Sequence, residues 1–183
     1  MTGDSFLKLI ETRQSVRGYL PSKVETEKLN RCLEAARLAP SACNAQPWKF
    51  IVVDEPVLKA ELAQATSSRL LGMNHFTLQA PVLIVIVIEK ANFTSNMGQI
   101  IKDREFPLID LGIATEHFCL QAMAEGLGTC ILGWFDEAKV KKLLSIPSQK
   151  RVGLIVTLGY SSSPEIRPKK RKEISEIVSY NKY

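Results

Sequence analysis

Two arginines and a hydroxyl lie within five residues near the start of the chain, in Arg13-Gln14-Ser15-Val16-Arg17. Guanidinium groups donate several hydrogen bonds in one plane, so they match phosphate and carbonyl oxygens well. Because the stretch directly follows an expected helix, its side chains can converge on one planar anionic ligand. The alternative is that both arginines make ordinary surface ion pairs, and the stretch alone leaves both interpretations open.

A second polar stretch, residues 40–48, reads Pro-Ser-Ala-Cys-Asn-Ala-Gln-Pro-Trp. Two prolines, a hydroxyl and two amides after a helix end predict a rigid polar loop. Such a loop can line a ligand site, or it can be a proline-stabilised turn that anchors Trp48 in the core.

Positive charge is concentrated near the C-terminus. The 183 residues carry a net charge of +5, of which residues 165–183 hold +3, mostly in Arg167-Pro168-Lys169-Lys170-Arg171-Lys172. Such a run is typical of a solvated tail, of a nucleic-acid contact, or of the anion site for a phosphate-bearing ligand.

The sequence lacks the motifs of several other functional sites. Gly126-x-Gly128 has Ile131 where a dinucleotide fingerprint needs a third glycine, and it leads from helix to strand, so a glycine helix end is expected instead. The sequence has neither a phosphate loop nor a nucleophile elbow. Two histidines and four cysteines without a Cys-x-x-Cys pair predict buried thiols and no metal site.

Composition places the chain among ordinary globular proteins, with 45% apolar and 23% charged residues. No repeat or linker divides it, so residues 1–183 are expected to form a single domain. The longest uninterrupted apolar run, residues 82–88, is far shorter than the roughly 20 residues that cross a bilayer. No secretory signal is visible, so the cytoplasm is the expected location.

Hydrophobic periodicity predicts the elements that must position the polar stretches. Helices are expected at 4–12, 24–39, 57–65, 107–125 and 136–144, and strands at 49–53, 82–88, 129–132 and 152–159. Asp4 or Ser5 is expected to cap the first helix, and Ser22 and Glu25 have capping-box spacing for the second.

Two of these elements are unusually apolar. The strand at 82–88 contains only Val, Leu and Ile, which indicates a central strand covered on both faces. The helix at 107–125 is apolar on nearly every side and must be buried in a core or against another subunit. Helices and strands mixed around one sheet predict the α+β class, while residues 175–183 could pack on their own domain or reach a partner.

Taken together, these stretches resemble the nitroreductase family of FMN-dependent flavoproteins. The matching motifs occur in order, as Arg-x-Ser-x-Arg at 13–17, Pro-Ser-x-x-Asn-x-Gln-Pro-Trp at 40–48, Ala80-Pro81, Gly126-Leu127-Gly128-Thr129 and Pro168-Lys169-Lys170-Arg171. The resemblance implies an α+β fold with a central mixed or antiparallel sheet flanked by helices. It also implies an intertwined homodimer with two FMN molecules in the subunit interface.

The resemblance further implies a set of cofactor-binding residues. They are Arg13, Gln14, Ser15, Arg17, Pro40, Ser41, Asn44, Gln46, Asn74, Leu132, Gly133, Lys169 and Arg171. Within this set, Arg13, Ser15, Lys169 and Arg171 would reach the phosphate and ribityl chain. Arg17 would face the pyrimidine edge of the ring, where fixed positive charge stabilises the reduced flavin.

The other residues would surround the ring. Pro40, Ser41 and Asn44, together with Gln46, would come from the other subunit, and Asn74 would approach from the segment before the Val/Ile strand. Leu132 and Gly133 would pass near the hydride-accepting nitrogen. Many relatives carry an acidic residue where this chain has Leu132, so a backbone contact is implied there.

The implied chemistry has two steps. NADH or NADPH passes a hydride to tightly but non-covalently bound FMN, and a nitroaromatic, a quinone or a similar small molecule then takes the electrons. The flavin carries this chemistry, so no catalytic side chain is expected. The expected partners are a second copy and the substrate, with no nucleic acid and no membrane. Alternatives are a flavin-binding or flavin-sensing protein without steady turnover, reductive dehalogenation and flavin fragmentation.

Overall fold

The computed structural model describes residues 2–68, 72–89 and 105–183. This part of the chain contains a four-stranded sheet of β1 (Trp48–Val53), β2 (Val82–Ile88), β3 (Gly128–Leu132) and β4 (Arg151–Gly159), ordered β1-β2-β4-β3. Each pair of neighbouring strands is antiparallel. The predicted α+β class is confirmed, and β3 forms one edge of the sheet.

Strand β2 is covered on both faces, as its apolar sequence predicted. Successive side chains of a strand point to opposite faces, so its residues divide between two cores. Leu83, Val85 and Val87 pack in one apolar cluster, and the alternate residues pack in the other, at Val82, Ile84 and Ile86.

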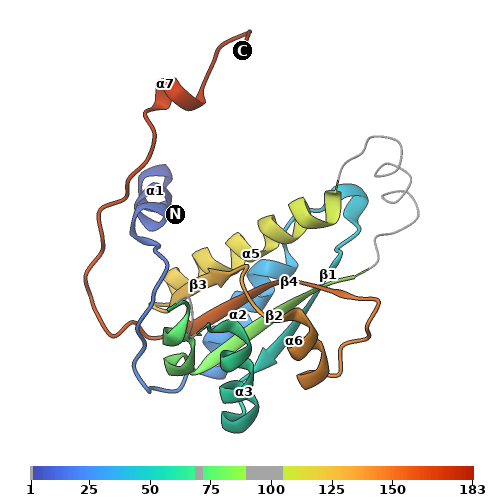
Figure 1. The fold of residues 1–183 in the computed structure, drawn as a ribbon. Helices are drawn as coiled ribbons and strands as arrows, with labels where there is room; N and C mark the ends of the chain where they lie inside the picture. Colours follow the sequence, from blue (N-terminus) through green and yellow to red (C-terminus); the bar gives the residue numbers. More distant parts are fainter. Residues whose placement is uncertain (1, 69–71, 90–104) are drawn as a thin grey trace.

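Helices cover the two faces of the sheet. The cluster on one face includes side chains of α2 (Thr26–Arg37) and α5 (Phe106–Ala124). The cluster on the other face includes side chains of α3 (Pro56–Thr66) and α6 (Glu137–Leu143), and the short helix η2 (His75–Gln79) packs against α3. Figure 1 shows α5 and α6 on opposite sides of the sheet. The predicted burial of the apolar helix α5 is confirmed.

Two predicted helix caps are wrong. Helix α1 (Gly3–Thr12) is capped by Thr2, whose hydroxyl accepts from the Ser5 amide, because the helix begins before Asp4. Helix α2 begins at Thr26 with Glu25 at the cap, so Ser22 lies outside it. The Glu25 carboxylate accepts hydrogen bonds from the Tyr160 hydroxyl at 2.7 and 2.9 Å instead of capping the helix.

The C-terminal segment leaves the body of the domain. Figure 1 shows it running past α1 and ending in the single turn α7 (Ile174–Ile177), away from the sheet. Ile174 and Ile177 are 73% and 65% exposed, so α7 does not pack on its own domain. Among the described residues, no helix is long and apolar enough to cross a membrane.

Candidate functional site

The Arg13–Arg17 stretch lies along the exposed edge of β3. Ser15 forms a parallel bridge with Thr129, and the Val16 amide donates to the Thr129 carbonyl at 2.8 Å. Gly128 permits this approach, because a Cβ added there would lie 2.5 Å from Val16 Cγ2. The stretch is therefore held by the sheet.

The glycines before β3 have different roles. Gly126 ends α5 with a φ of 76°, a backbone conformation that glycine adopts without strain. Its amide donates to Met123, and the Leu127 amide donates to Ala122, which is the Schellman pattern. The predicted glycine helix end is confirmed, and Gly128 serves the packing of Val16.

Gln14 joins this stretch to the C-terminal basic run, more than 150 residues away in sequence. Its amide nitrogen donates to the Glu165 carbonyl at 2.7 Å, and its amide oxygen accepts from the Arg167 backbone and guanidinium at 3.2 and 3.1 Å. Arg167 also donates to the Ser15 carbonyl. Lys169 donates to the carbonyls of Ile10, at 2.9 Å, and Arg13 at the end of α1.

These two segments enclose a hollow of about 410 Å3, which we call the basic pocket. It is lined by Arg13, Gln14, Ser15, Arg17, Arg167, Pro168, Lys169, Lys170 and Arg171. Six of these lining residues are cationic and none is acidic. The pocket brings together six of the thirteen predicted cofactor-binding residues, from both ends of the chain.

The electrostatic surroundings of the pocket are strongly positive. Partial burial lowers the pKa of Lys169, and the nearby charges of Arg13 and Arg171 lower it further. The Arg13 guanidinium lies 3.4 Å from a carboxylate outside the lining, that of Glu116 on α5. Bringing a dianion into this pocket would relieve repulsion among cations that the fold already holds in place.

The loop at residues 40–48 is strained. It contains the short helix η1 (Ala42–Asn44), and Cys43, Asn44 and Gln46 have positive φ angles of 51°, 52° and 48°. Non-glycine residues in this region cost of order 1 kcal/mol each, and such strain clusters at functional sites. The predicted polar loop therefore has a fixed and unfavourable backbone.

Hydrogen bonds hold this loop in shape. The Gln46 amide donates to the Ser41 hydroxyl at 2.9 Å, and the Gln46 side chain donates to the Asn44 side chain at 3.1 Å. The Ala42 amide lies 3.1 and 3.2 Å from the two carboxylate oxygens of Asp110 on α5.

Comparison with known proteins identifies the fold and the family. Residues 10–160 match the family model described as Nitroreductase family. The chain belongs to the nitroreductase family. The predicted family resemblance is thus confirmed.

Three relatives show what this nitroreductase-family chain is similar to. An NADH dehydrogenase from Thermus thermophilus is 27% identical, and the match covers 91% of each chain. An iodotyrosine deiodinase from Thermotoga neapolitana is 28% identical, with 96% of this chain and 97% of the relative covered. The solved structure of an FMN-dependent nitroreductase from Clostridium difficile is 28% identical with a TM-score of 0.79, covering 97% and 99%.

The residues of the basic pocket fit the phosphate end of FMN, the cofactor that the family resemblance implies. Arginine forks and an ammonium match phosphate oxygens, and the Ser15 hydroxyl lies beside them. Burial raises the pKa of the neighbouring Cys130 thiol, while Arg17 and the Ser15 hydroxyl partly offset that rise. Arg17 and Ser15 therefore lie close to Cys130.

The other predicted site residues of this nitroreductase-family chain do not line the basic pocket. Pro40, Ser41, Asn44 and Gln46 belong to the strained loop, which the family resemblance brings to the flavin of the other subunit. Their contacts with FMN stay a prediction, because the structure describes a single chain.

Asn74, Leu132 and Gly133 also lie outside the pocket lining. Asn74 has a φ of 59°, precedes η2, and donates its side-chain amide to the Thr66 carbonyl at 3.0 Å. Leu132 is buried at the end of β3, and Gly133 is exposed directly after it. Asn74 thus has a structural contact, and its predicted flavin contact remains untested.

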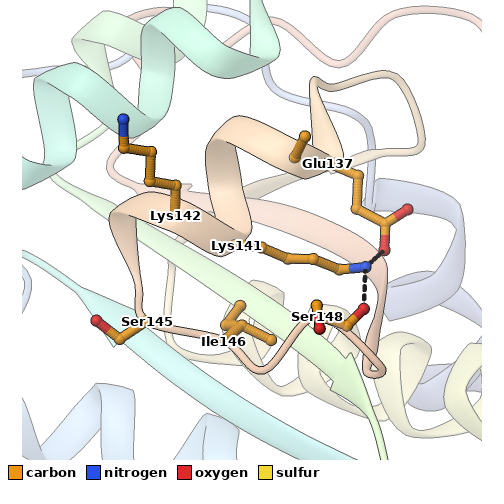
Figure 2. A pocket seen from close by; sticks show the side chains of 7 residues that line it. Glu137, Lys141, Lys142, Ser145, Ile146 and Ser148 are labelled. Carbon is orange, nitrogen blue, oxygen red and sulfur yellow. Dashed lines mark hydrogen bonds and ion pairs between the residues drawn. The ribbon is translucent and has the colours of Figure 1, made fainter.

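A larger hollow lies elsewhere and contains none of the predicted site residues. It measures about 800 Å3 and lies against α6. Figure 2 shows Lys141 extended between Glu137 and Ser148, with its ammonium 2.8 Å from Glu137 Oε1 and 3.3 Å from the Ser148 carbonyl. Glu137 and Lys141 in its lining are paired with each other, so size alone does not mark the site.

Sequence reasoning missed two carboxylates that hold the predicted site in place. Glu116 pairs with Arg13, and Asp110 binds the Ala42 amide. Asp110 carried a readable signal, since it and Glu116 are the two acids of α5, a helix in which most residues are apolar. A charge buried in such a helix needs a specific partner.

Proposed function

We propose that the protein is an FMN-dependent oxidoreductase that oxidises NADH or NADPH and reduces a small acceptor such as a nitroaromatic or a quinone. The basic pocket carries this proposal, because it gathers cations from the two ends of a nitroreductase-family chain around one hollow. The relatives named as an NADH dehydrogenase and an FMN-dependent nitroreductase support the donor and the cofactor.

Each predicted cofactor-binding residue of the pocket then has a defined task. Arg13, Ser15, Lys169 and Arg171 bind the phosphate and ribityl oxygens, and Gln14 holds the two segments together. Arg17 supplies fixed positive charge toward the pyrimidine edge, which favours a negatively charged ring. Bound tightly and non-covalently, FMN supplies the hydride-transfer chemistry, so the protein needs to bind, orient and exclude water.

The functional unit proposed here is a homodimer, because the family resemblance brings residues 40–46 to the ring from a second copy. The exposed apolar surface supports this proposal. Phe6 of α1 and Leu38, which follows α2, are exposed and border an apolar hollow of about 310 Å3, and Ile174 and Ile177 of α7 are uncovered. Dilution should release flavin and dissociate the subunits over the same concentration range.

Anaerobic visible spectroscopy of the FMN-loaded dimer tests the redox proposal. One equivalent of NADH or NADPH should bleach the flavin band, and addition of a quinone or nitroarene should restore it. A protein that binds no FMN, or a bound flavin that neither nucleotide bleaches, would refute an NAD(P)H oxidoreductase.

Reductive dehalogenation is a second candidate, favoured by the relative named as an iodotyrosine deiodinase. The discriminating assay supplies reduced protein with 3-iodotyrosine and, separately, with a quinone. Release of iodide with slow quinone reduction would favour dehalogenation, and the reverse would favour the first proposal.

A nucleic-acid partner fits the structure less well. Arg167, Lys169 and Arg171 donate hydrogen bonds to backbone carbonyls of their own domain, so three of the run's five cations are already engaged. Binding to DNA through phosphates must weaken steeply with salt. We expect the protein to show no DNA binding that weakens steeply with salt.

A further inference from the structure

We propose that Asp110 is a positioning residue that holds the strained loop at residues 41–46 in the conformation required at the flavin. The inference rests on the proposed function, and it assigns a task to a side chain outside the predicted flavin contacts. Asp110 lies on α5 and is 4% exposed.

The contact between Asp110 and the loop is direct. Both carboxylate oxygens lie within hydrogen-bond distance of the Ala42 amide, at 3.1 and 3.2 Å. Ala42 is the first residue of η1, and the next two residues both have left-handed backbone conformations. The carboxylate therefore binds the backbone amide of the residue that directly precedes the first residue with a positive φ angle.

The loop makes further bonds within itself. Asn44 and Ala45 donate backbone hydrogen bonds to the carbonyls of Ser41 and Ala42, and the Gln46 amide donates to the Ser41 hydroxyl. These bonds fix the loop's internal shape, but they do not fix its place on the domain. Asp110 supplies a bond from the loop to a helix of the core.

A carboxylate at this buried position is energetically unfavourable. Burial of a charge is unfavourable unless hydrogen bonds or an opposite charge compensate it. The Ala42 amide donates to the Asp110 carboxylate and offsets part of this cost. An apolar residue would suit the surrounding core better, so the acid is explained by the backbone group that it holds.

Helix α5 also connects the loop to the basic pocket. Glu116, six residues after Asp110 on the same helix, lies 3.4 Å from the Arg13 guanidinium. One rigid helix thus sets the positions of Arg13 and of the loop. In the proposed dimer, the loop of each subunit reaches the partner's flavin, whereas its basic pocket binds the phosphate of its own flavin. Helix α5 would then hold the loop at one flavin in a fixed position relative to the phosphate of the other flavin.

The test compares Asp110→Ala, Asp110→Asn and Asp136→Ala with the unmodified dimer. Asp136 is a matched control, because its carboxylate also accepts one backbone amide bond, from Lys139 at 3.0 Å, at the start of α6. The readouts are the dissociation constant of FMN, the visible spectrum of bound FMN, and hydrogen exchange of the Ala42 amide.

We expect Asp110→Ala to weaken FMN binding about tenfold, to shift the visible flavin band, and to raise exchange at Ala42. Asp110→Asn keeps a carbonyl oxygen that can accept the Ala42 bond, so it should restore most of the affinity and the protection. Asp136→Ala should lower thermal stability while leaving all three readouts near those of the unmodified protein. If Asp110→Ala does not fold, Asp110→Leu, which fills the buried position without an acceptor for the Ala42 amide, takes its place in the same comparison with Asp136→Ala.

The outcomes separate the two proposals. If the unmodified protein binds FMN but folded Asp110→Ala matches Asp136→Ala in affinity and spectrum, the positioning role is overturned and the proposed function stands. If Asp110→Leu is the variant that decides, FMN binding and Ala42 exchange identical to the control overturn it. Failure of the unmodified protein to bind FMN overturns the proposed function and this inference together.

Discussion

The basic pocket and the strained loop at residues 40–48 are built in different ways. The pocket rests on long-range bonds, in which Ser15 and Val16 pair with β3 and Gln14 clamps the C-terminal segment. The loop rests on local turns, three left-handed residues and the carboxylate of Asp110. A single chain therefore forms the basic pocket, which is the proposed phosphate half of the site, whereas the proposed ring half needs the loop of a second copy.

Substitution of Arg13 should have the largest effect and should be confined to the pocket. Arg13→Ala removes a guanidinium from the phosphate site, so FMN binding should weaken about 10- to 100-fold. Riboflavin, which lacks the phosphate, should bind about as before. Flavin fluorescence quenching measures both affinities, and Lys172→Ala is the control because Lys172 does not line the pocket.

The corresponding substitution in the loop should behave differently. Asn44→Ala removes a side chain that the resemblance places at the ring, so FMN and riboflavin should both bind about fivefold more weakly. Equal losses of FMN and riboflavin in Arg13→Ala, or a loss confined to FMN in Asn44→Ala, would contradict the division into a phosphate half and a ring half.

The contact between Gly128 and Val16, which positions the basic pocket, can be disrupted without substituting a cationic residue. Gly128→Ala would place a Cβ 2.5 Å from Val16 Cγ2 and force the Arg13–Arg17 stretch away from β3. We expect a loss of about 1–3 kcal/mol in the free energy of unfolding, together with weaker FMN binding. Urea denaturation measures the first and fluorescence quenching the second.

A second-site change checks the cause. Val16→Ala removes the two methyl groups that the new Cβ would meet, so the double variant should recover part of the FMN affinity. Gly3→Ala is the control, since a Cβ there meets nothing within 4 Å. An unaltered FMN affinity in Gly128→Ala would show that the close contact with Val16 does not position the pocket.

These dependences explain how far the sequence could predict the structure. Local signals were sufficient for most elements, since the apolar run at 82–88 and the periodicity of 107–125 each describe one segment and its burial. The cap of α2 could not be read, because Glu25 binds Tyr160, which lies 135 residues later. Capping patterns describe neighbours in sequence and carry no information about such partners.

The candidate site shows the same division. The residues that gather in the basic pocket were predicted from their types and from the family resemblance, but the clamp by Gln14 was not. Both ends of its amide are used on residues 165 and 167, a pairing that depends on how two distant segments meet. The role of Asp110 was hidden for a related reason, because its partner is a backbone amide that has no sequence signature.

The pocket half should be sensitive to alkaline conditions. Tyr19 donates its buried hydroxyl to the Val16 carbonyl at 3.0 Å and lies 2.5 Å from the Thr157 hydroxyl, so Tyr19→Phe should lower the free energy of unfolding by about 1 kcal/mol at pH 7. Burial raises the pKa of Tyr19 well above its ordinary value. Its contribution is therefore complete below about pH 10 and is lost as the pH rises further.

Denaturation at pH 7 and at increasing alkaline pH tests this prediction. The parent should lose stability more steeply than Tyr19→Phe above about pH 10. Tyr180→Phe is the control, because Tyr180 is fully accessible near the C-terminus. Parallel pH profiles for the parent and Tyr19→Phe would count against a role of the buried phenol.

The loop half should instead be sensitive to acid, though only slightly. Glu125 at the end of α5 accepts two hydrogen bonds of 2.6 Å from Arg31 of α2, the helix that leads into the loop, and this pairing lowers the pKa of Glu125 to about 2. A depressed pKa means that the contribution is present above the ordinary value near 4.5 and is lost as the pH falls toward 2. Glu125→Gln should therefore flatten the fall in stability between these values. Glu34→Gln is the control, because it breaks a pair within α2 alone and leaves the α2–α5 link intact. It should flatten the pH profile of stability less than Glu125→Gln does. The opposite ranking would show that the acid sensitivity does not come from the link between the two helices.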